Sequence, residues 1–245
     1  MGRPIFDHKL RLRGPSTAAA VDPTPTNPSS ERWFAYEEQN PQAITKGVSI
    51  MGASTATAAG GTAVFNDGTG SYINYTSGTG ISAVGGLAAA AANLVQLRHL
   101  PDILFVMKTG AVAADISNVR IWVGMHTDGA LATDVPGSLG ISGVVFRYST
   151  PAGDTNWQAH TFDGVGDTAV DTGVVVTADT RYVFRIRATS TTTIEFYING
   201  TLVAMAAGTI PAGTTNLQFG YCHTVNALAG TARAIRWRKT FIHSL

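Results

Sequence analysis

The sequence has few of the residues that carry redox, metal or covalent chemistry. Among its 245 residues Cys222 is the single cysteine, which excludes an internal disulfide framework and a metal site built from several cysteines. The six histidines are scattered singly, so we expect no bound metal and no cofactor. Phosphate-binding loops, serine-hydrolase elbows and zinc-protease motifs are also absent from the sequence.

Charged residues are scarce as well, at 13% of the chain, and the formal net charge is +1. This balance gives no reason to expect a nucleic-acid partner. No apolar run approaches the ~20 residues that cross a bilayer, and Met1 is not followed by the apolar core of a signal peptide. We therefore expect a protein made in the cytoplasm, without a membrane partner, which leaves a cell only by a route such as lysis.

The residues that are abundant favour short β-strands joined by turns, and residues 180–205 show this most clearly. Asn199 and Gly200 separate two β-rich segments, and both residues accept the positive φ of a two-residue type I′ turn. The preceding strand alternates, with Tyr182 and Phe184 predicted inward and Arg185 outward. The cross-strand pairs predicted from this turn are Ile194 with Met205, Phe196 with Val203, and Tyr197 with Leu202.

Similar strand patterns recur at short intervals, and turn residues separate nearly all of them. About a dozen short strands of this kind indicate a single all-β domain, a two-sheet antiparallel jelly-roll sandwich. Residues 87–93 fit either a short helix or a loop. The other predicted strands are 62–66, 71–76, 94–100, 103–108, 119–126, 143–149, 156–162, 172–176, 216–224 and 232–242.

The N-terminal part differs in composition, and we expect residues 1–46 to form an extended arm before a sandwich of residues 47–245. Four of the ten prolines lie between positions 14 and 28, which disfavours a packed core. Trp33 and Phe34 are expected to pin the arm to the sandwich. The basic residues predicted to anchor the arm on a partner are Arg3, Lys9, Arg11 and Arg13.

Several segments, in their order along the chain, resemble a family of phage virion proteins with a concanavalin A-like (lectin/glucanase-type) jelly roll. The resemblance starts near residue 47 and does not include the arm. It implies a two-sheet jelly roll on the surface of a phage particle. The segments are Phe65 to Gly68 (FNDG), 103–108 (ILFVMK), 119–125 (VRIWVGM), 143–147 (GVVFR), 180–182 (TRY), 194–203 (IEFYINGTLV), Ile210 with Pro211, and 235–237 (IRW).

Glycan-cleaving members of this wider fold resemble one another in carrying two glutamates around an aspartate on one strand. This sequence has no such run, and Glu195 is the one glutamate beyond the arm. The aspartates lie at turns and strand ends, where their conformational preferences place them. We therefore expect no enzymatic activity. Calcium in the loops at 66–68 and 163–167 stays open, because oxygen ligands are present there.

Alternation also predicts a row of outward polar and aromatic side chains. If their strands share a sheet, these side chains form one exposed face. Arginine binds carboxylates in a bidentate manner and aromatic rings pack on sugar faces, so an acidic glycan and a neighbouring virion subunit are both candidate ligands. The third interpretation is that the arginines only keep the sheet hydrated and discourage pairing at its edges. The predicted partner-binding residues are Arg120, Trp122, His126, Arg185, Arg187, Arg236 and Arg238.

We accordingly expect a non-enzymatic structural component of a bacteriophage virion, either a capsid decoration or a tail fibre or other appendage. The expected partners are major capsid or tail subunits, and a homo-oligomer, with a trimer as the working hypothesis. The alternative is an adhesin that binds a host-surface glycan through the arginine and tryptophan face. A glycan hydrolase rests on fold analogy alone.

Overall fold

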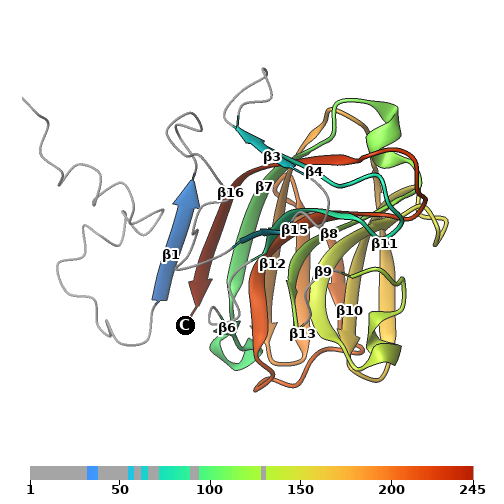
Figure 1. Ribbon diagram of the computed structural model, residues 1–245. Coiled ribbons are helices and arrows are strands. Elements are labelled where there is room, and N and C mark those ends of the chain that lie inside the picture. Colours follow the sequence, from blue (N-terminus) through green and yellow to red (C-terminus); the bar gives the residue numbers. More distant parts are fainter. Residues whose placement is uncertain are drawn as a thin grey trace, which may run out of the picture.

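The computed structural model of the chain describes residues 32–37, 55–57, 62–65, 72–88, 94–127 and 131–244. These residues form two antiparallel β-sheets packed face to face, joined by turns and three short 3₁₀ helices (Figure 1). The 3₁₀ helices are η3 (Leu97–His99), η4 (Ala113–Ile116) and η5 (Pro136–Leu139). No helix within the described ranges is long and apolar enough to cross a membrane. The predicted all-β jelly-roll class is confirmed.

The first sheet, called here the Arg185 sheet, has the strand order β14-β13-β12-β7-β16-β4-β3, and β1 also pairs with β16. Its strands are β1 (Arg32–Glu37), β3 (Thr62–Phe65), β4 (Ile73–Thr76), β7 (Asp102–Thr109), β12 (Arg181–Ser190), β13 (Thr193–Ile198), β14 (Thr201–Ala206) and β16 (Ala234–Ser244).

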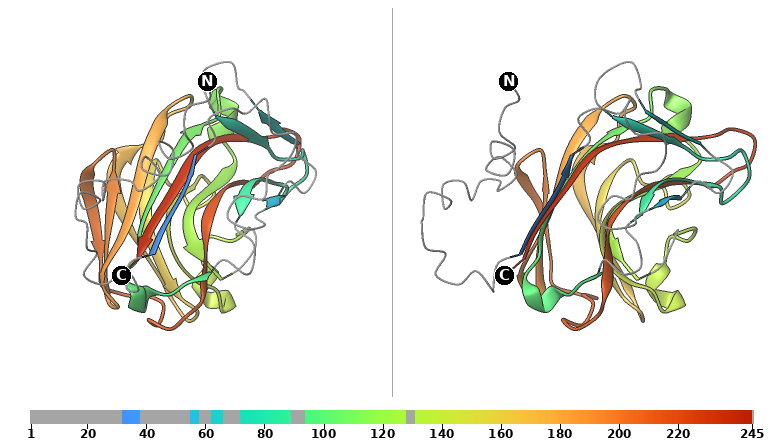
Figure 2. Two further views of the ribbon diagram at one scale, coloured as in Figure 1. Left: turned by 90° about the vertical axis from the view of Figure 1, so that its left-hand side faces the viewer. Right: turned by 60° about the vertical axis from the view of Figure 1, so that its left-hand side comes forward.

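The second sheet, called here the Trp122 sheet, has the order β11-β10-β9-β8-β15-β5-β2, and β6 also pairs with β15. Its strands are β2 (Thr55–Thr57), β5 (Val84–Ala88), β6 (Leu94–Val95), β8 (Val119–His126), β9 (Ser142–Ser149), β10 (Asn156–Asp163), β11 (Asp167–Val175) and β15 (Leu217–Asn226). Consecutive strands often change sheet, as Figure 2 shows for β15 and β16, which lie in different layers.

The core lies between the two sheets and is formed by the inward residues of both. Phe146 of β9 packs against two residues of the opposite sheet, with ring-centroid distances of 4.5 Å to Phe184 and 5.2 Å to Phe196. Trp157 of β10 lies 4.8 Å from Phe184 and 5.4 Å from Tyr182 in the same way. Buried aromatic pairs of this kind stabilise the packing of the two sheets beyond the free energy gained from apolar burial.

The hairpin of β13 and β14 has the predicted turn but not the whole predicted register. Asn199 and Gly200 have φ values of 51° and 86°, as a type I′ turn requires. Next to the turn Tyr197 faces Leu202, as predicted. Beyond it an irregularity in β14 shifts the pairing by one residue, because a β-bulge adds a residue to one strand. The observed pairs are Phe196 with Ala204, Glu195 with Met205, and Ile194 with Ala206.

Other differences from the predicted strands are local. The predicted strand 94–100 is a strand only at Leu94–Val95 and then turns into η3. Residues 84–88 are the strand β5, so the start of the ambiguous segment 87–93 is extended, and 89–93 lie outside the described residues. The strand predicted at 172–176 begins earlier, at Asp167.

One part of the predicted arm belongs to the sandwich. The strand β1 contains Trp33 and Phe34, and its backbone pairs antiparallel with β16 along the edge visible in Figure 1. The anchoring residues predicted at positions 3, 9, 11 and 13 lie outside the described residues. The boundary at residue 46 therefore stays a prediction.

Candidate functional site

The residues predicted to bind a partner lie on two different outer faces, so the condition for one shared face, that their strands belong to one sheet, is not met. The reason is that the chain changes layer between β7 and β8, and β8 then pairs with β9 and β15 rather than with β12. The binding role of each residue stays a prediction. Arg120, Trp122 and His126 belong to the Trp122 sheet, whereas Arg185, Arg187, Arg236 and Arg238 belong to the Arg185 sheet.

The outer face of the Trp122 sheet is covered where Trp122 lies. Trp122 and His126 are both fully buried. Residues 131–141, called here the covering segment, contribute Leu131 and Ile141 to a small apolar cluster that includes Trp122. Alternation along β8 correctly placed Trp122 away from the main core, but its expected exposure is wrong because another segment packs over it.

Two arginine–aspartate pairs hold the covering segment and a neighbouring loop against this sheet. Arg120 Nε and Nη2 donate to Asp134 Oδ1 and Oδ2 at 2.9 and 3.0 Å. Arg147 Nε and Nη2 donate to Asp154 Oδ2 and Oδ1 at 3.0 and 3.1 Å, and Arg147 Nη1 donates to the Asp134 carbonyl oxygen at 3.1 Å. Ser149 donates to Asp134 from its hydroxyl and to Asp154 from its backbone N–H. The two carboxylates therefore converge on Ser149.

Burial and polar contacts shift the pKa of Asp134 in opposite directions. Desolvation alone would raise this pKa, but hydrogen bonds from Arg120 and Ser149 and the nearby charge of Arg147 outweigh it. The pKa of Asp134 consequently lies below its ordinary value. A carboxyl group in this state serves as an ionised acceptor or a weak base rather than as a general acid.

His160 is the second ring on this covered face. Its ring is stacked on Trp122 with centroids 5.8 Å apart. Burial, helped by the charge of Arg147, lowers the pKa of His160 to about 3, so the imidazole is neutral near pH 7. Its Nε2 lies 3.2 Å from Asp167 Oδ1 but without hydrogen-bond geometry, and we therefore do not regard this contact as a charged pair.

The outer face of the Arg185 sheet is accessible along β12, β13 and β14, where polar side chains form ordered rows across the strands. In one row Arg185 of β12 faces Tyr197 of β13, which faces Leu202 of β14. In the next row Arg187 faces Glu195, which faces Met205. The last members of the two rows, Leu202 and Met205, are exposed by 45% and 57%. We call Asp102, Arg185, Arg187, Glu195 and Tyr197 the Tyr197 patch.

Two carboxylates fix the polar groups of the Tyr197 patch. Asp102 Oδ1 and Oδ2 accept from Arg185 Nε and Nη2 at 2.7 and 2.5 Å, and this hydrogen bonding raises the pKa of Arg185. The Tyr197 hydroxyl donates to Glu195 Oε2 at 2.7 Å, which is the main reason why the pKa of Tyr197 is raised. Glu195 Oε2 also lies 3.7 Å from Arg187 Nη1. Arg185 Cζ is 5.2 Å from the centroid of the Tyr197 ring.

A second polar cluster lies at the other end of the same face. Asp179 Oδ1 lies 2.7 Å from both Lys108 Nζ and Arg236 Nη1. Alternation correctly predicted that Arg236 lies on the outer face of the sheet. Its side chain is nevertheless only 7% exposed, so the predicted accessibility is wrong. Arg238 is partly exposed, at a point where the pairing of β16 with β7 shifts.

Reasoning from the sequence missed five residues of the two clusters on this face: Asp102, Lys108, Asp179, Glu195 and Tyr197. The two aspartates were interpreted as turn residues, and Glu195 only as evidence against a paired carboxylate. The alternation of β13 did contain the needed signal, because it places Glu195 and Tyr197 on one face opposite Arg187 and Arg185. The ion pairs of Asp102 and Asp179 depend on contacts between strands distant in sequence, which no local pattern reveals.

The described residues include no group of three or more histidine, cysteine, aspartate or glutamate side chains placed to hold a metal ion. In the loop 163–167, Asp163 Oδ1 accepts from the backbone N–H groups of Val165 and Gly166, both at 2.9 Å. This is the usual role of aspartate in a turn. The other loop considered for calcium, 66–68, lies outside the described residues.

No protein-family model and no curated protein matches this sequence. Solved structures do match. A protein of unknown function from Shewanella oneidensis MR-1 has a TM-score of 0.62 at 12% identity, covering 94% of this chain and 93% of that one. The Bacillus licheniformis β-glucanase has a TM-score of 0.53 at 10% identity, covering 86% and 97%. The Emp47p carbohydrate recognition domain has a TM-score of 0.52 at 9% identity, covering 88% and 96%.

The glucanase similarity corrects the expectation that this chain has no enzymatic activity. A prokaryotic β-1,3-1,4-glucanase and a further glycosidic hydrolase share the fold, each with a TM-score of 0.51. The fold therefore serves hydrolases as well as carbohydrate recognition domains. The argument from a missing glutamate run on one strand was too narrow, because carboxylates from separate loops can converge in space, as Asp134 and Asp154 do at Ser149.

These similarities, all at low sequence identity, establish the architecture and nothing finer. The chain is a two-sheet jelly roll of the type found in concanavalin A-like and galectin-like proteins.

Proposed function

We propose that this chain binds carbohydrate, and that the Tyr197 patch is the binding surface. The observation that carries the proposal is the partly exposed ring of Tyr197, which lies between the Asp102–Arg185 and Glu195–Arg187 pairs on the accessible part of the sheet face. The presence of a glucanase and a carbohydrate recognition domain among the structural neighbours supports the same class of ligand.

The geometry suits a sugar because a sugar ring has an apolar face and an edge of hydroxyl groups. The Tyr197 ring and the exposed part of Leu202 offer apolar surface. Asp102 and Glu195 offer acceptors, and Arg185 and Arg187 offer donors, to the hydroxyl groups around that surface. The residues of the Tyr197 patch lie on paired strands and contact one another, so their side chains already have defined orientations. Binding therefore costs little side-chain entropy.

The test is binding of purified protein to an array of neutral and acidic oligosaccharides, followed by affinity measurements with Tyr197→Ala. We expect an affinity loss of about tenfold, since an aromatic contact contributes roughly 1 kcal/mol or more. Val165→Ala is the matched control, because Val165 is 84% exposed and lies in the turn between β10 and β11. Unchanged affinity in Tyr197→Ala, or no binding by the wild type, would contradict the proposal.

We also propose, as the biological setting, a bacteriophage particle in which the chain is a capsid decoration or a tail appendage. Two observations support this setting: the order of the sequence motifs and the pairing of β1 with β16, which ties residues 32–37 to the sandwich just after the basic, proline-rich segment. In this setting the glycan would belong to a host surface.

Quantitative mass spectrometry of purified particles tests the setting. A copy number close to that of the major capsid protein would indicate decoration, and a few to a few dozen copies would indicate a tail or vertex appendage. Absence of the protein from particles would contradict the virion setting and leave carbohydrate binding untouched. A variant lacking residues 1–30 should fold but fail to enter particles.

A further inference from the structure

Leu202 and Met205 of β14 lie on the same side of the Arg185 sheet, although they are three positions apart in the sequence. In a regular strand two such residues would face opposite sides. The bulge in the hairpin adds one residue, Val203, to β14 between them. Their partners are consequently Tyr197 and Glu195, which both lie on the outer face of β13. Bulges often reorient a side chain next to a functional site in this way.

Met205 and Leu202 provide exposed apolar surface beside the Tyr197 patch. The two side chains are 57% and 45% exposed, whereas the other methionines of the described residues, Met107 and Met125, are fully buried in the core. An unbranched thioether adapts its shape to the group that it contacts, and methionine is frequent at binding surfaces for this reason. An apolar part of a ligand can therefore be buried on this surface.

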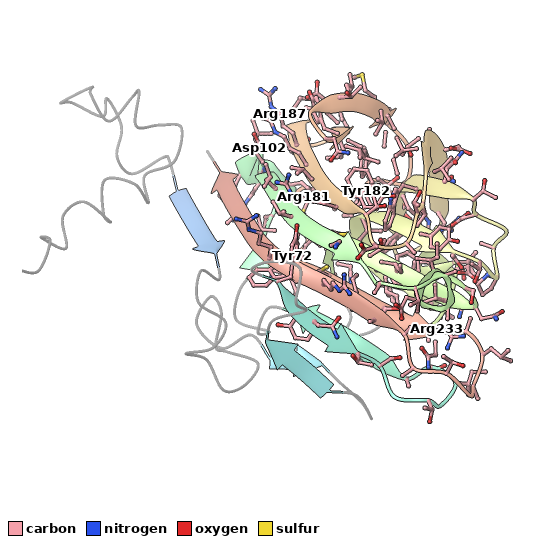
Figure 3. The ribbon with its side chains drawn as sticks, turned by 90° about the horizontal axis from the view of Figure 1, so that it is seen from above. Tyr72, Asp102, Arg181, Tyr182, Arg187 and Arg233 are labelled. Carbon is pink, nitrogen blue, oxygen red and sulfur yellow. The ribbon has the colours of Figure 1, made fainter. Side chains whose placement is uncertain are left out.

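Glu195, which faces Met205 across the hairpin, has an oxygen that can accept a hydrogen bond from a ligand. The Tyr197 hydroxyl donates to Oε2 of Glu195 at 2.7 Å, and Arg187 Nη1 lies 3.7 Å from the same oxygen. Arg187 itself lies next to Asp102, as Figure 3 shows. Because these contacts orient the carboxylate through Oε2, its Oε1 can accept from a bound molecule.

An acetamido group matches this pair of features. In its trans form the N–H and the methyl group lie on the same side of the planar amide, opposite the carbonyl oxygen. A hydrogen-bond donor and a small apolar group thus point in neighbouring directions, and Glu195 and Met205 are neighbours in the sheet. A sugar hydroxyl could also donate to Glu195, but it would leave the apolar surface of Met205 and Leu202 in water.

We propose that the bound glycan contains an N-acetylated amino sugar, whose amide N–H donates to Glu195 and whose methyl group packs on Met205 and Leu202. This inference rests on the proposed carbohydrate-binding function and names the class of sugar. The ring that carries the acetamido group packs on Tyr197. Its N–H donates to an ionised acceptor, which makes this hydrogen bond one of the stronger, charge-assisted kind.

Two β-1,4-linked tetrasaccharides test the inference, one of N-acetylglucosamine and one of glucose, because they differ only at the acetamido group. We expect the acetylated compound to bind at least about fourfold more tightly, the factor that burial of one methyl group gives. Met205→Ala should lower the affinity for this compound by about the same factor and leave that for the glucose compound unchanged. Leu139→Ala is the matched control, because Leu139 is 66% exposed on η5, which contacts β10 and β11 of the other sheet.

Equal affinity for the two tetrasaccharides, or an unchanged preference in Met205→Ala, would overturn the inference and leave the proposed function standing. If neither tetrasaccharide binds, the oligosaccharide array decides. Binders that mostly carry an acetamido group would support the inference, and binders that mostly lack one would overturn it. An array without any binder would overturn the proposed function as well.

Discussion

Arg185 and Asp102 form a two-pronged ion pair that joins the neighbouring strands β12 and β7 on the outer face of the Arg185 sheet. The two contacts are 2.7 and 2.5 Å long, and the side chains are 39% and 24% exposed. Solvent screens a pair with this exposure, so its geometry fixes the direction of the guanidinium group more than it stabilises the fold.

Asp102→Ala should therefore have a small effect on stability and a larger effect on binding. We expect the free energy of unfolding to fall by about 0.2–1 kcal/mol, the usual range for a solvent-screened pair. Affinity for a bound oligosaccharide should fall further, because Arg185 loses its fixed orientation. Urea unfolding and calorimetric titration measure the two effects. A stability loss above about 2 kcal/mol would show that the pair is structural.

Asp154→Ala, in contrast, should have a large effect on the stability of the fold. Asp154 and Arg147 are 7% and 10% exposed, so removing the carboxylate leaves a buried guanidinium group without its two-pronged partner. The expected loss is about 3 kcal/mol in the free energy of unfolding. Asp171→Ala is the control, since this aspartate is exposed and bonds Asn156 and Gly173 at the edge of the sheet. Equal losses in the two variants would contradict the view that burial decides the cost.

Acid should destabilise the sandwich through its buried histidines. Burial lowers the pKa values of His160 and His223 to about 3 from 6.5, so below pH 6.5 the unfolded chain binds protons that the folded chain does not. Stability is then complete above pH 6.5 and falls as the pH decreases toward 3. Each histidine contributes a slope of about 1.4 kcal/mol per pH unit well below pH 6.5.

The slope can be measured by urea unfolding at several pH values between 5.5 and 4.5. His160→Gln should reduce the slope by one histidine's share, whatever it does to stability at pH 7. An unchanged slope in this variant would mean that His160 is protonated in the folded protein.

The turn between β13 and β14 should favour glycine over any other residue at position 200. Its φ of 86° is a conformation that L-residues avoid, so Gly200→Ala should cost about 1 kcal/mol. Gly80→Ala is the matched control, because a Cβ there would meet no atom within 4 Å and the backbone is not strained. We expect the control to be neutral or slightly stabilising in thermal unfolding. Equal midpoints for the two variants would contradict the turn assignment.

The sequence was sufficient for the fold class, most strands and the inner faces, because alternation and turn residues are local signals. Tyr182, Phe184 and Ile186 are buried as the alternation of β12 predicts. Long-range features were not accessible in this way. The bulge in β14 gives Phe196 the partner Ala204 instead of the predicted Val203. The layer change between β7 and β8 puts Trp122 and Arg185 in different sheets.

Trp122 shows that a side chain on the outer face of a sheet is not necessarily exposed to solvent. Its side chain leaves the main core, as predicted, and is then buried by the covering segment. Trp122→Ala would create a cavity costing about 3–5 kcal/mol, so lost binding in that variant would report unfolding rather than ligand contact. Partly exposed positions on the other sheet, such as Tyr197, are the informative ones.

The most direct test of carbohydrate binding at the Tyr197 patch is NMR mapping of the face that contacts an oligosaccharide selected on the array. The account predicts that titration shifts the amide signals of Arg185, Glu195 and Tyr197 and leaves those of Trp122 and His160 unchanged. Shifts confined to Trp122, His160 and the covering segment would place the ligand on the opposite sheet and contradict the central claim.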